Sequence, residues 1–237
     1  MVKVVVITPT PNEYRSVSDC LGRTSFSKLD CQAYESGPGR INAIFTATRE
    51  LWPLRASNSG PVILVGCGTA GSLSLNLAAG EVIVSNRAVI SDWRREDGQT
   101  VKVSPYGWFD YKSPDPEQVA KMVIESRDLM VKYLLTELTE KGFKSADTLT
   151  SEAFVEGRDH KLKLGRTFNC AVCDMESGAL AYLAGRLLNV AWFNIRIVAD
   201  TLDEALGDYF AKERNITEIL GRKTVEILSL LDSLIEG

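Results

Sequence analysis

The segment Val62-Ile63-Leu64-Val65-Gly66-Cys67-Gly68-Thr69-Ala70-Gly71 joins a short apolar run to a glycine-rich motif. The run from Pro61 to Val65 is short, apolar and β-rich, so it predicts a strand that is buried on both faces. Further β-rich runs occur at Val2 to Ile7, Val82 to Ser85 and Ala191 to Val198. Because these runs alternate with helical patterns, the sequence predicts an α/β fold with a central mixed, mostly parallel twisted sheet flanked by helices.

The helical patterns lie between and after these runs. Gly39 to Leu51 and Ser177 to Leu188 are helix candidates, and Pro114 to Leu138 carries apolar residues near a 3.6-residue period. The C-terminal stretch from Ile219 to Ile235 predicts a helix that docks on the sheet. The stretch from Ser91 to Pro116 is aromatic and irregular, which is typical of a lid or a partner surface.

Composition limits the class of protein. A chain of 237 residues suits one sizeable α/β domain, so we expect a single domain over residues 1–237. The net charge is -4 and no long run of Lys or Arg occurs, which favours a small-molecule partner over nucleic acid. The apolar start is too short for a signal peptide, and no apolar stretch is long enough to span a membrane. We therefore expect a cytoplasmic protein.

Cysteine usage points to a reducing compartment and away from a metal site. The chain has five cysteines, an odd number, which favours free thiols. Cys170 and Cys173 form a single C-x-x-C pair, and His160 is the only histidine. Four nitrogen or sulfur ligands for zinc cannot readily be assembled from this set. We expect no metal and no cofactor.

Polar residues and glycines follow several of the expected strands. Gly66 to Gly71 follow the run ending at Val65, Glu176 follows the run Cys170 to Val172, and Asp200 follows the run ending at Val198. In open α/β sheets, ligands bind outside the carboxyl ends of the strands, so these segments are expected to converge on one site. A right-handed crossover would bring the two acids to the same edge of the sheet.

Asp174 and Glu176 have a second interpretation at this point. Both precede an expected helix, where acids favour the helix N-terminus electrostatically without any part in a site. The motif Gly66-Cys67-Gly68-Thr69-Ala70-Gly71 also fits the dinucleotide-binding pattern of oxidoreductases. However, Gly80 interrupts a following helix, and the strand ending at Ser85 lacks the expected acid. The glycines are better explained as positions where backbone approaches a ligand closely.

Several motifs in order resemble one family of enzymes nearly from end to end. The chain is similar to the nucleoside phosphorylase and nucleosidase superfamily, most closely to the 5'-methylthioadenosine/S-adenosylhomocysteine nucleosidases. The motifs are Ser36-Gly37-Pro38-Gly39-Arg40, Gly68-Thr69-Ala70-Gly71-Ser72-Leu73 with Ala79-Gly80-Glu81-Val82-Ile83-Val84-Ser85, Ser151-Glu152-Ala153-Phe154-Val155, Asp174-Met175-Glu176-Ser177 and Arg196-Ile197-Val198-Ala199-Asp200.

This resemblance implies cleavage of the N-glycosidic bond of a purine nucleoside, with two catalytic acids. Asp200 resembles the acid that protonates the purine near N7, and Glu13 matches, within one residue of alignment, the glutamate that activates water. Glu176 resembles the carboxylate that holds the ribose hydroxyls, with Met175 packed against the sugar. The role of Asp174 is not specified by the resemblance.

The remaining site residues follow from the same resemblance. Phe154 and Val155 are expected to contact the base, while Thr69 and Arg196 hold the water and its base. The aromatic wall around the 5'-substituent would comprise Tyr106, Trp108 and Phe210. The family also implies a homodimer or higher homo-oligomer, with Tyr106 lent by the neighbouring subunit.

Departures from the family pattern leave the nucleophile and the substrate open. Gly66 stands where phosphorylases carry a phosphate-binding arginine, and the histidine that they lend across the subunit interface has no counterpart here, which favours hydrolysis; Arg15 and Arg40 keep phosphorolysis as an alternative. Ala199 replaces the usual Ser. Arg158 lies where pyrimidine-specific relatives place base-recognition residues, but their full Gln/Arg pair is absent.

An adenine 5'-thionucleoside ranks first as the substrate, before other purine nucleosides. Futalosine hydrolase and a non-catalytic nucleoside-binding protein are further alternatives. Retention of Glu13, Glu176 and Asp200 argues against pure binding, because a binder needs neither a base nor an acid.

Overall fold

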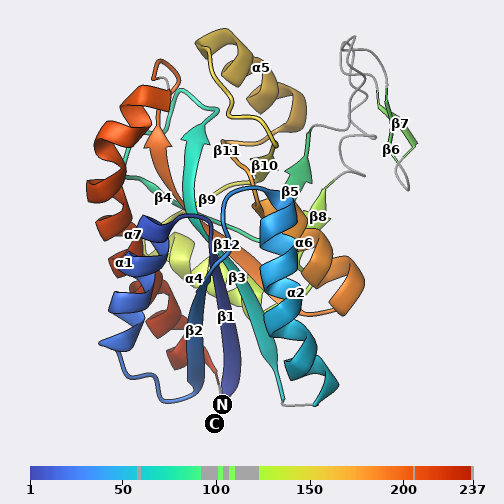
Figure 1. Ribbon diagram of the computed structural model, residues 1–237, viewed down its shortest axis with the longest axis vertical. Helices are drawn as coiled ribbons and strands as arrows, with labels where there is room; N and C mark the ends of the chain where they lie inside the picture. The colour runs from blue at the N-terminus through green and yellow to red at the C-terminus, as the bar shows by residue number, and fades with distance from the viewer. Residues whose placement is uncertain (58–59, 92–100, 104–106, 110–122, 205, 236–237) are drawn as a thin grey trace.

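The structure is a computed structural model that describes residues 1–57, 60–91, 101–103, 107–109, 123–204 and 206–235 (Figure 1). Its centre is a mixed sheet, in which the described strands follow the order β8-β5-β10-β11-β3-β12-β4-β9, with β1 beside β3 and β2 beside β1. The strands of this sheet are β1 (Val2–Thr8), β2 (Leu29–Glu35), β3 (Val62–Ser72), β4 (Val82–Ser85), β5 (Arg87–Ile90), β8 (Ile124–Glu125), β9 (Lys144–Ser145), β10 (Thr148–Thr150), β11 (Val172–Asp174) and β12 (Ala191–Asp200). A separate hairpin pairs β6 (Val101–Val103) with β7 (Gly107–Phe109).

Helices cover both faces of the sheet, as Figure 1 shows. The helices are α1 (Pro11–Gly22), α2 (Arg40–Ala56), α4 (Leu129–Glu140), α5 (Arg158–Phe168), α6 (Ser177–Tyr182) continued by π-helical turns (Leu183–Leu188), and α7 (Leu206–Leu234). The core residues of α1, α4 and α7 pack on one face, and those of α2 and α6 pack on the other. Most strand pairs are parallel, so the expected fold class of a mixed, mostly parallel sheet flanked by helices is confirmed.

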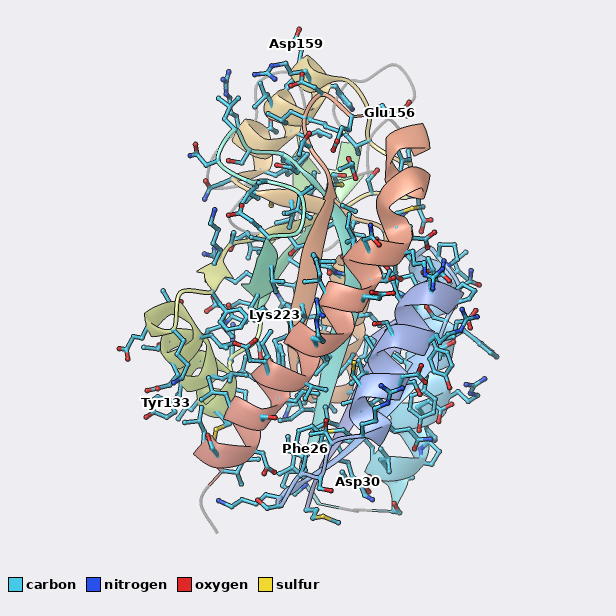
Figure 2. The ribbon with its side chains drawn as sticks, turned by 90° about the vertical axis from the view of Figure 1, so that its left-hand side faces the viewer. Phe26, Asp30, Tyr133, Glu156, Asp159 and Lys223 are labelled. Atoms are coloured by element: carbon cyan, nitrogen blue, oxygen red, sulfur yellow. The ribbon has the colours of Figure 1, made fainter. Side chains whose placement is uncertain are left out.

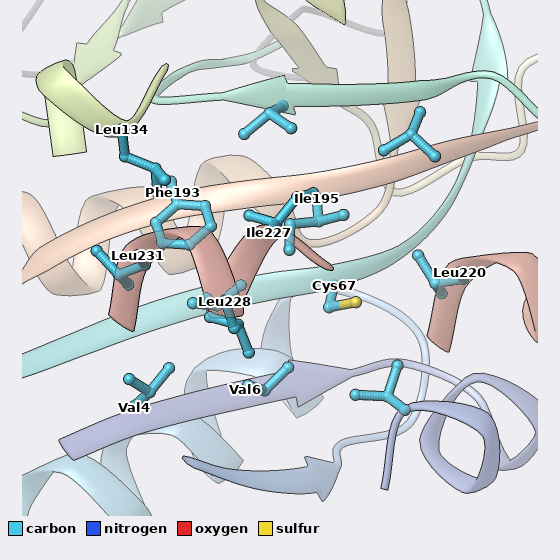
Figure 3. Packing of buried hydrophobic residues seen from close by; sticks show 14 of the residues in the cluster. Val4, Val6, Cys67, Leu134, Phe193, Ile195, Leu220, Ile227, Leu228 and Leu231 are labelled. Carbon is cyan, nitrogen blue, oxygen red and sulfur yellow. The ribbon is translucent and has the colours of Figure 1, made fainter. Parts of the chain in front are cut away.

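Strand β1 illustrates how the apolar runs build two cores. Val4 and Val6 belong to the cluster under α1 and α7, whereas Val5 and Ile7 belong to the cluster under α2. Because successive side chains of a strand point to opposite faces, a run without polar alternation is buried on both sides. Figure 3 shows the first cluster, where Val4 and Val6 face the α7 residue Leu228. Figure 2 shows α7 crossing this face beside α1.

Two expectations about the elements were wrong, and a third was confirmed. The glycine motif does not follow a strand, because β3 continues through Gly66 to Gly71 and ends at Ser72. Within the expected helix Pro114 to Leu138, the described residues include the short strand β8, and α4 begins only at Leu129, where Asp128 caps its N-terminus. The expected helix Ser177 to Leu188 is confirmed: it is α-helical as far as Tyr182 and π-helical from Leu183 to Leu188.

The expected crossover between the two acid-bearing strands also differs. β11 and β12 are not neighbours, because β3 lies between them, and β11 is antiparallel to β3 whereas β12 is parallel to it. The two strands nevertheless meet at one residue. Gly71 pairs with Cys173 on one side and with Asp200 on the other. The acids therefore meet at the carboxyl end of β3. A simple strand-helix-strand unit does not bring them together.

Candidate active site

The site forms where one edge of β3 changes partner. Along this edge β1 pairs with residues as far as Gly66, and β11 pairs from Gly71 onward. In the described part of the chain, no strand pairs with the intervening residues on this edge, while β12 pairs with them on the other. Backbone groups between the two partners are thus available for other contacts. One of these groups is the backbone amide of Thr69, which donates a hydrogen bond to the Glu13 carboxylate.

Glu13 is buried and has two roles at once. It is the third residue of a capping box at the start of α1, in which its Oε2 accepts from the Thr10 amide at 2.9 Å. Its other oxygen, Oε1, accepts from the backbone amide and the hydroxyl of Thr69 at 2.7 and 2.8 Å. Burial raises the pKa of Glu13, and the hydrogen bonds from Thr69 and Thr10 together with Arg196 oppose that rise. A base with a raised pKa is closer to the neutral range in which general bases work best.

Arg196 is the buried cation between the acids. Its Nε lies 2.7 Å from Asp174 Oδ2 and donates to Ser177 Oγ at 3.0 Å, and its Nη1 lies 3.7 Å from Glu176 Oε2. Neither Nη1 nor Nη2 has a hydrogen-bond partner among the described residues. Gly68 keeps space beside this group, since a Cβ there would lie 2.5 Å from Arg196 Nη1 and 3.1 Å from Glu13 Oε1. The Glu13 carboxylate and Nη1 of Arg196 therefore both lie next to Gly68.

Asp174 acquires a role that the sequence did not specify. Its carboxylate accepts from the Thr150 hydroxyl at 2.7 Å, from the Ser177 amide and hydroxyl, and it pairs with Arg196. These contacts fix the direction in which the guanidinium points. Asp174 is thus a positioning residue for Arg196, and its contact with the α6 N-terminus is only part of that role.

Glu176 faces the loop before α2. Its Oε1 accepts from the backbone amide of Gly39 at 2.8 Å. Gly39 has φ +92°, a left-handed conformation that favours glycine, and it brings its amide directly to the carboxylate. Burial raises the pKa of Glu176 to about 8, with Arg196 acting in the opposite direction and Asp174 in the same one.

Asp200 is the last residue of β12, which pairs with the edge of β3 opposite to the edge bound by β1 and β11. A register shift between Val198 and Asp200, typical of a β-bulge, brings its carboxylate against Gly71. A Cβ at Gly71 would lie 2.8 Å from Asp200 Oδ2, so a glycine is needed for this approach. Ala199, which replaces the family's usual Ser, is buried in the core under α7.

Lys161 of α5 is a site residue that the sequence analysis missed. Its Nζ donates to Asp200 Oδ2 at 2.7 Å, and both side chains are buried. Burial raises the pKa of Asp200, and Lys161 opposes that rise. The signal that could have revealed Lys161 is its spacing from Leu164 and Phe168, the buried face of the same helix.

A small cavity joins the expected base-binding residues to Asp200. Phe154, Val155, Lys161 and Met175 line it together with Asp200, and its volume is about 30 Å³. Ligand pockets usually measure roughly 300–1,000 Å³. The walls of this cavity must therefore separate before a ligand of ordinary size enters. Phe154, which is 36% exposed, lies at its surface.

The comparisons with known proteins agree with this arrangement. The family model of the phosphorylase superfamily matches residues 3–236. The chain belongs to this superfamily. A 5'-methylthioadenosine/S-adenosylhomocysteine nucleosidase of Baumannia cicadellinicola is 25% identical over 84% of this chain and 80% of its own. The relatives are thus named nucleosidases, which are N-glycosidases, and the resemblance stated from the motifs is confirmed.

Solved structures share the fold of this superfamily member. A futalosine hydrolase mutant of Helicobacter pylori has a TM-score of 0.74 and 16% identity, covering 99% of this chain and 100% of that one. The 5'-methylthioadenosine nucleosidase of Arabidopsis thaliana has the same TM-score and identity, covering 99% of each chain. At this identity the likeness shows the fold. No helix in the described part of the chain is long and apolar enough to cross a membrane.

Some expected site residues cannot be placed in this superfamily member. Tyr106 and the side chains of Trp108 and Phe210 lie outside the part of the chain that the structure describes. Arg15 is described, and it lines a groove between α1 and α7 whose lining includes none of the expected site residues. Arg158 pairs with Asp203 at 2.5 Å on the surface.

The resemblance places the phosphate-binding arginine of phosphorylases at Gly66, and the space beside this glycine is filled by a side chain of the neighbouring strand β12. Gly66 faces Asn194 across the β3–β12 pair, and a Cβ at Gly66 would lie 2.3 Å from Asn194 Oδ1. Arg40, the other arginine considered for phosphate, donates from Nε to Glu152 Oε1 at 2.7 Å. In this superfamily member, then, neither position supplies an uncommitted guanidinium.

Proposed function

We propose that this protein hydrolyses the N-glycosidic bond of a purine nucleoside and releases the base and the free sugar. The observation that carries this proposal is the placement of two buried acid groups on opposite edges of β3, Glu13 on one side and Asp200 on the other. Such a pair suits a bond whose cleavage needs a base at the sugar and an acid at the departing purine.

Glu13 is the proposed base that activates water. Three hydrogen bonds, from Thr69 and Thr10, use three of the roughly four acceptor positions of its carboxylate. One acceptor position remains for a water proton, and the Nη atoms of Arg196, which make no hydrogen bond to the described residues, supply donors beside it. Glu13 would take one proton from the water as the water oxygen adds to the sugar C1' atom.

Glu176 and Met175 are the proposed sugar contacts. A carboxylate at this place would accept hydrogen bonds from the ribose hydroxyls and stabilise positive charge on the sugar ring. Its Oε2 makes only the 3.7 Å contact with Arg196 Nη1 among the described residues, so it retains acceptor capacity. Met175 lines the cavity next to it and offers a polarisable apolar surface.

Asp200 is the proposed acid, with Phe154 and Val155 as contacts of the base. Burial raises the pKa of Asp200, which favours the protonated form that proton donation needs. The proton would pass to purine N7 while the electron pair of the glycosidic bond moves onto the ring. Phe154 borders the same cavity and can stack on a planar base.

Water is the preferred nucleophile in this proposal. Phosphorolysis needs cationic side chains for the phosphate charge. Gly66 supplies none, Arg40 is engaged with Glu152, and Arg15 lines the groove between α1 and α7 instead of the proposed site. A purine nucleoside phosphorylase is the alternative that the assay below separates from a hydrolase.

Adenine 5'-thionucleosides are the first substrates to test, because the curated relatives are named for them. Futalosine hydrolysis is a second candidate, since a futalosine hydrolase matches the fold with the same TM-score, 0.74, as the Arabidopsis thaliana nucleosidase. A non-catalytic nucleoside-binding protein is less favoured, because it has no use for a buried base and acid.

We also propose that residues 1–237 act as one cytoplasmic domain in a homodimer or higher homo-oligomer, without a cofactor. Helix α2 supports the assembly: Ile41, Phe45 and Trp52 lie on one side of it and are 82%, 68% and 63% exposed. An exposed apolar stripe of this kind is typical of a protein interface. Light scattering that shows a monomer would contradict the assembly.

The function is tested by product analysis. The protein is incubated with methylthioadenosine, S-adenosylhomocysteine, adenosine, inosine, futalosine and uridine, with and without phosphate, and the sugar product is identified. We expect free sugar from a purine nucleoside whether or not phosphate is present. A sugar 1-phosphate would show a phosphorylase, and the absence of any cleavage would refute the proposed activity.

A further inference from the structure

The contacts of Lys161 connect it to the proposed acid more closely than a structural lysine requires. Its Nζ donates to Asp200 Oδ2 at 2.7 Å, to the Thr201 carbonyl at 2.7 Å and to the Glu204 carbonyl at 3.2 Å. Three acceptors match the three hydrogens of an ammonium group. The side chain is 1% exposed, so this cation has been brought fully into the protein, where a charge needs a compensating partner.

Lys161 also lies on the wall of the cavity that leads to Asp200. Both residues line it with Phe154 and Val155, the expected contacts of the base. α5 follows the segment that carries Phe154 and Val155, and Gly157 immediately precedes its first residue. One short stretch of chain therefore supplies the base-contacting residues and a cation for the acid.

We propose that Lys161 acts with Asp200 as a paired acid, in which the ammonium stabilises the carboxylate that remains after Asp200 has given its proton to the purine. This inference rests on the proposed function and assigns Lys161 as a positioning residue at the end of the site where the purine would lie. It does not require Lys161 to lose a proton.

The proton balance of the step is simple. The Asp200 O–H bond breaks, a bond from that hydrogen to purine N7 forms, and the electron pair of the C1'–N9 bond moves onto the purine. The new negative charge on Asp200 lies 2.7 Å from Lys161 Nζ, so it forms beside a cation that is already in place. After the base leaves, solvent returns a proton to Asp200, and the proton that Glu13 took from water returns to solvent.

The surrounding charges favour Lys161 as the group that controls Asp200. Glu204, in the loop after β12, raises the pKa of Asp200, as burial does, and Lys161 lowers it. Asp174 lines the same cavity and is engaged with Arg196. Arg158 and Asp203 form an ion pair with each other on the surface. Among the described residues that face Asp200, Lys161 is therefore the cation that can stabilise its ionised form.

The first test compares the pH profile of kcat/KM in wild type, Lys161→Met and Lys161→Arg, using the purine nucleoside that wild type cleaves fastest. Activity needs protonated Asp200 and falls as pH rises through its pKa. Removing the neighbouring cation raises that pKa, so the alkaline limb of Lys161→Met should move up by about one pH unit or more. Its kcat should fall about 10-fold or more because the acid is weaker, with a smaller change in KM. Lys161→Arg should restore the limb toward wild type.

A substrate with an activated leaving group separates acid catalysis from general damage. Nitrophenolate leaves without protonation, so Lys161→Met should keep near wild-type kcat on a nitrophenyl riboside. Equal losses on both substrates with an unmoved alkaline limb would overturn the proposal and leave Lys161 a structural role. Lys163→Met changes an exposed lysine of the same helix and should match wild type in both assays.

A measurement without turnover keeps this inference distinct from the proposed function. Carbon-13 NMR of the Asp200 carboxyl, assigned with Asp200→Asn, gives its titration midpoint in wild type and in Lys161→Met. We expect a higher midpoint in Lys161→Met, and an unchanged one would refute the pair even if wild type cleaves nucleosides. If Lys161→Met does not fold, Lys161→Gln takes its place. If wild type cleaves no nucleoside, the proposed function fails while the titration still tests the pair.

Discussion

The proposed site has a sugar end, around Glu13, Glu176 and Arg196, and a purine end, around Asp200 and Lys161. The two ends balance their charges differently. Glu13, Asp174 and Glu176 surround one guanidinium, that of Arg196, whereas Asp200 faces one ammonium, that of Lys161. Carboxylates outnumber the cation where cleavage would build positive charge on the sugar. The purine end carries a matched pair where negative charge would leave with the purine. Under the proposed function, this difference places more acidic groups than cations beside the sugar, and one of each beside the purine, before any substrate binds.

The sharpest way to break this comparison is to remove the cation of the sugar end. Arg196→Met leaves buried carboxylates without their partner, so we expect a loss of about 3–5 kcal/mol in the free energy of unfolding, measured with urea. Activity should be lost in the folded fraction. Arg214→Met removes an exposed arginine and should change the unfolding free energy by less than about 0.5 kcal/mol. Equal stability of the two variants would contradict the central role of Arg196.

The two ends should agree in their effect on activity when each loses its proposed catalytic group. Glu13→Gln and Asp200→Asn should each lower kcat at least about 100-fold, the lower range for lost base or acid catalysis. Gln at position 13 can still complete the capping box with Thr10, so α1 should be retained, as circular dichroism would show. Near-normal turnover in either variant would remove the role assigned to that residue.

Glycines on β3 sharpen the comparison further. Gly71→Ala would force the Asp200 carboxylate to move, so kcat should fall about 10- to 100-fold, the scale of a misplaced catalytic group. Gly66→Ala meets Asn194 within the core, and it should reduce stability by about 1–3 kcal/mol while the folded fraction keeps its kcat. A Gly71→Ala enzyme with wild-type kcat would show that Asp200 does not need its observed position.

A change of pH should also test the sugar end, through the dependence of stability on the protonation of Glu176. Burial raises its pKa from 4.5 to about 8, so the folded protein binds more protons than the unfolded chain between these values. Its contribution to stability is complete below the lower value and is lost as pH rises through the upper one, with a slope of at most about 1.4 kcal/mol per pH unit. Relative to wild type, Glu176→Gln should therefore gain stability between about pH 5 and about pH 8. Urea unfolding that shows no such trend would contradict the raised pKa.

The fold class could be predicted from local patterns of the sequence, whereas the roles expected for the acids came from the family resemblance. β-rich runs predicted the strands β1, β4 and β12, of which the last two lacked polar alternation, and acids after such runs predicted the edge of the sheet at which they meet. The path of β3 could not be predicted in this way. Its glycines resemble a turn, and only pairing with β12 shows that they continue a strand.

The finer contacts of the site depend on side chains that are distant in sequence. Asp174 and Lys161 had no assigned role because their partners, Arg196 and Asp200, lie on another strand. A lysine in an amphipathic helix is usually solvated, and burial of Lys161 becomes evident only when its helix packs against the cavity. Asn194 was missed for a similar reason, since its contact with Gly66 exists only across paired strands.

The capping box of α1 has an evolutionary consequence. Glu13 begins a helix and also reaches Thr69, so a chain that lost its activity would still be under selection to keep an acid or amide at this position. Persistence of Glu13 among descendants would then record the inheritance of a folding signal as much as of a reaction. Drift from Glu to Gln would be the first mark of a lineage that has stopped using the position for chemistry.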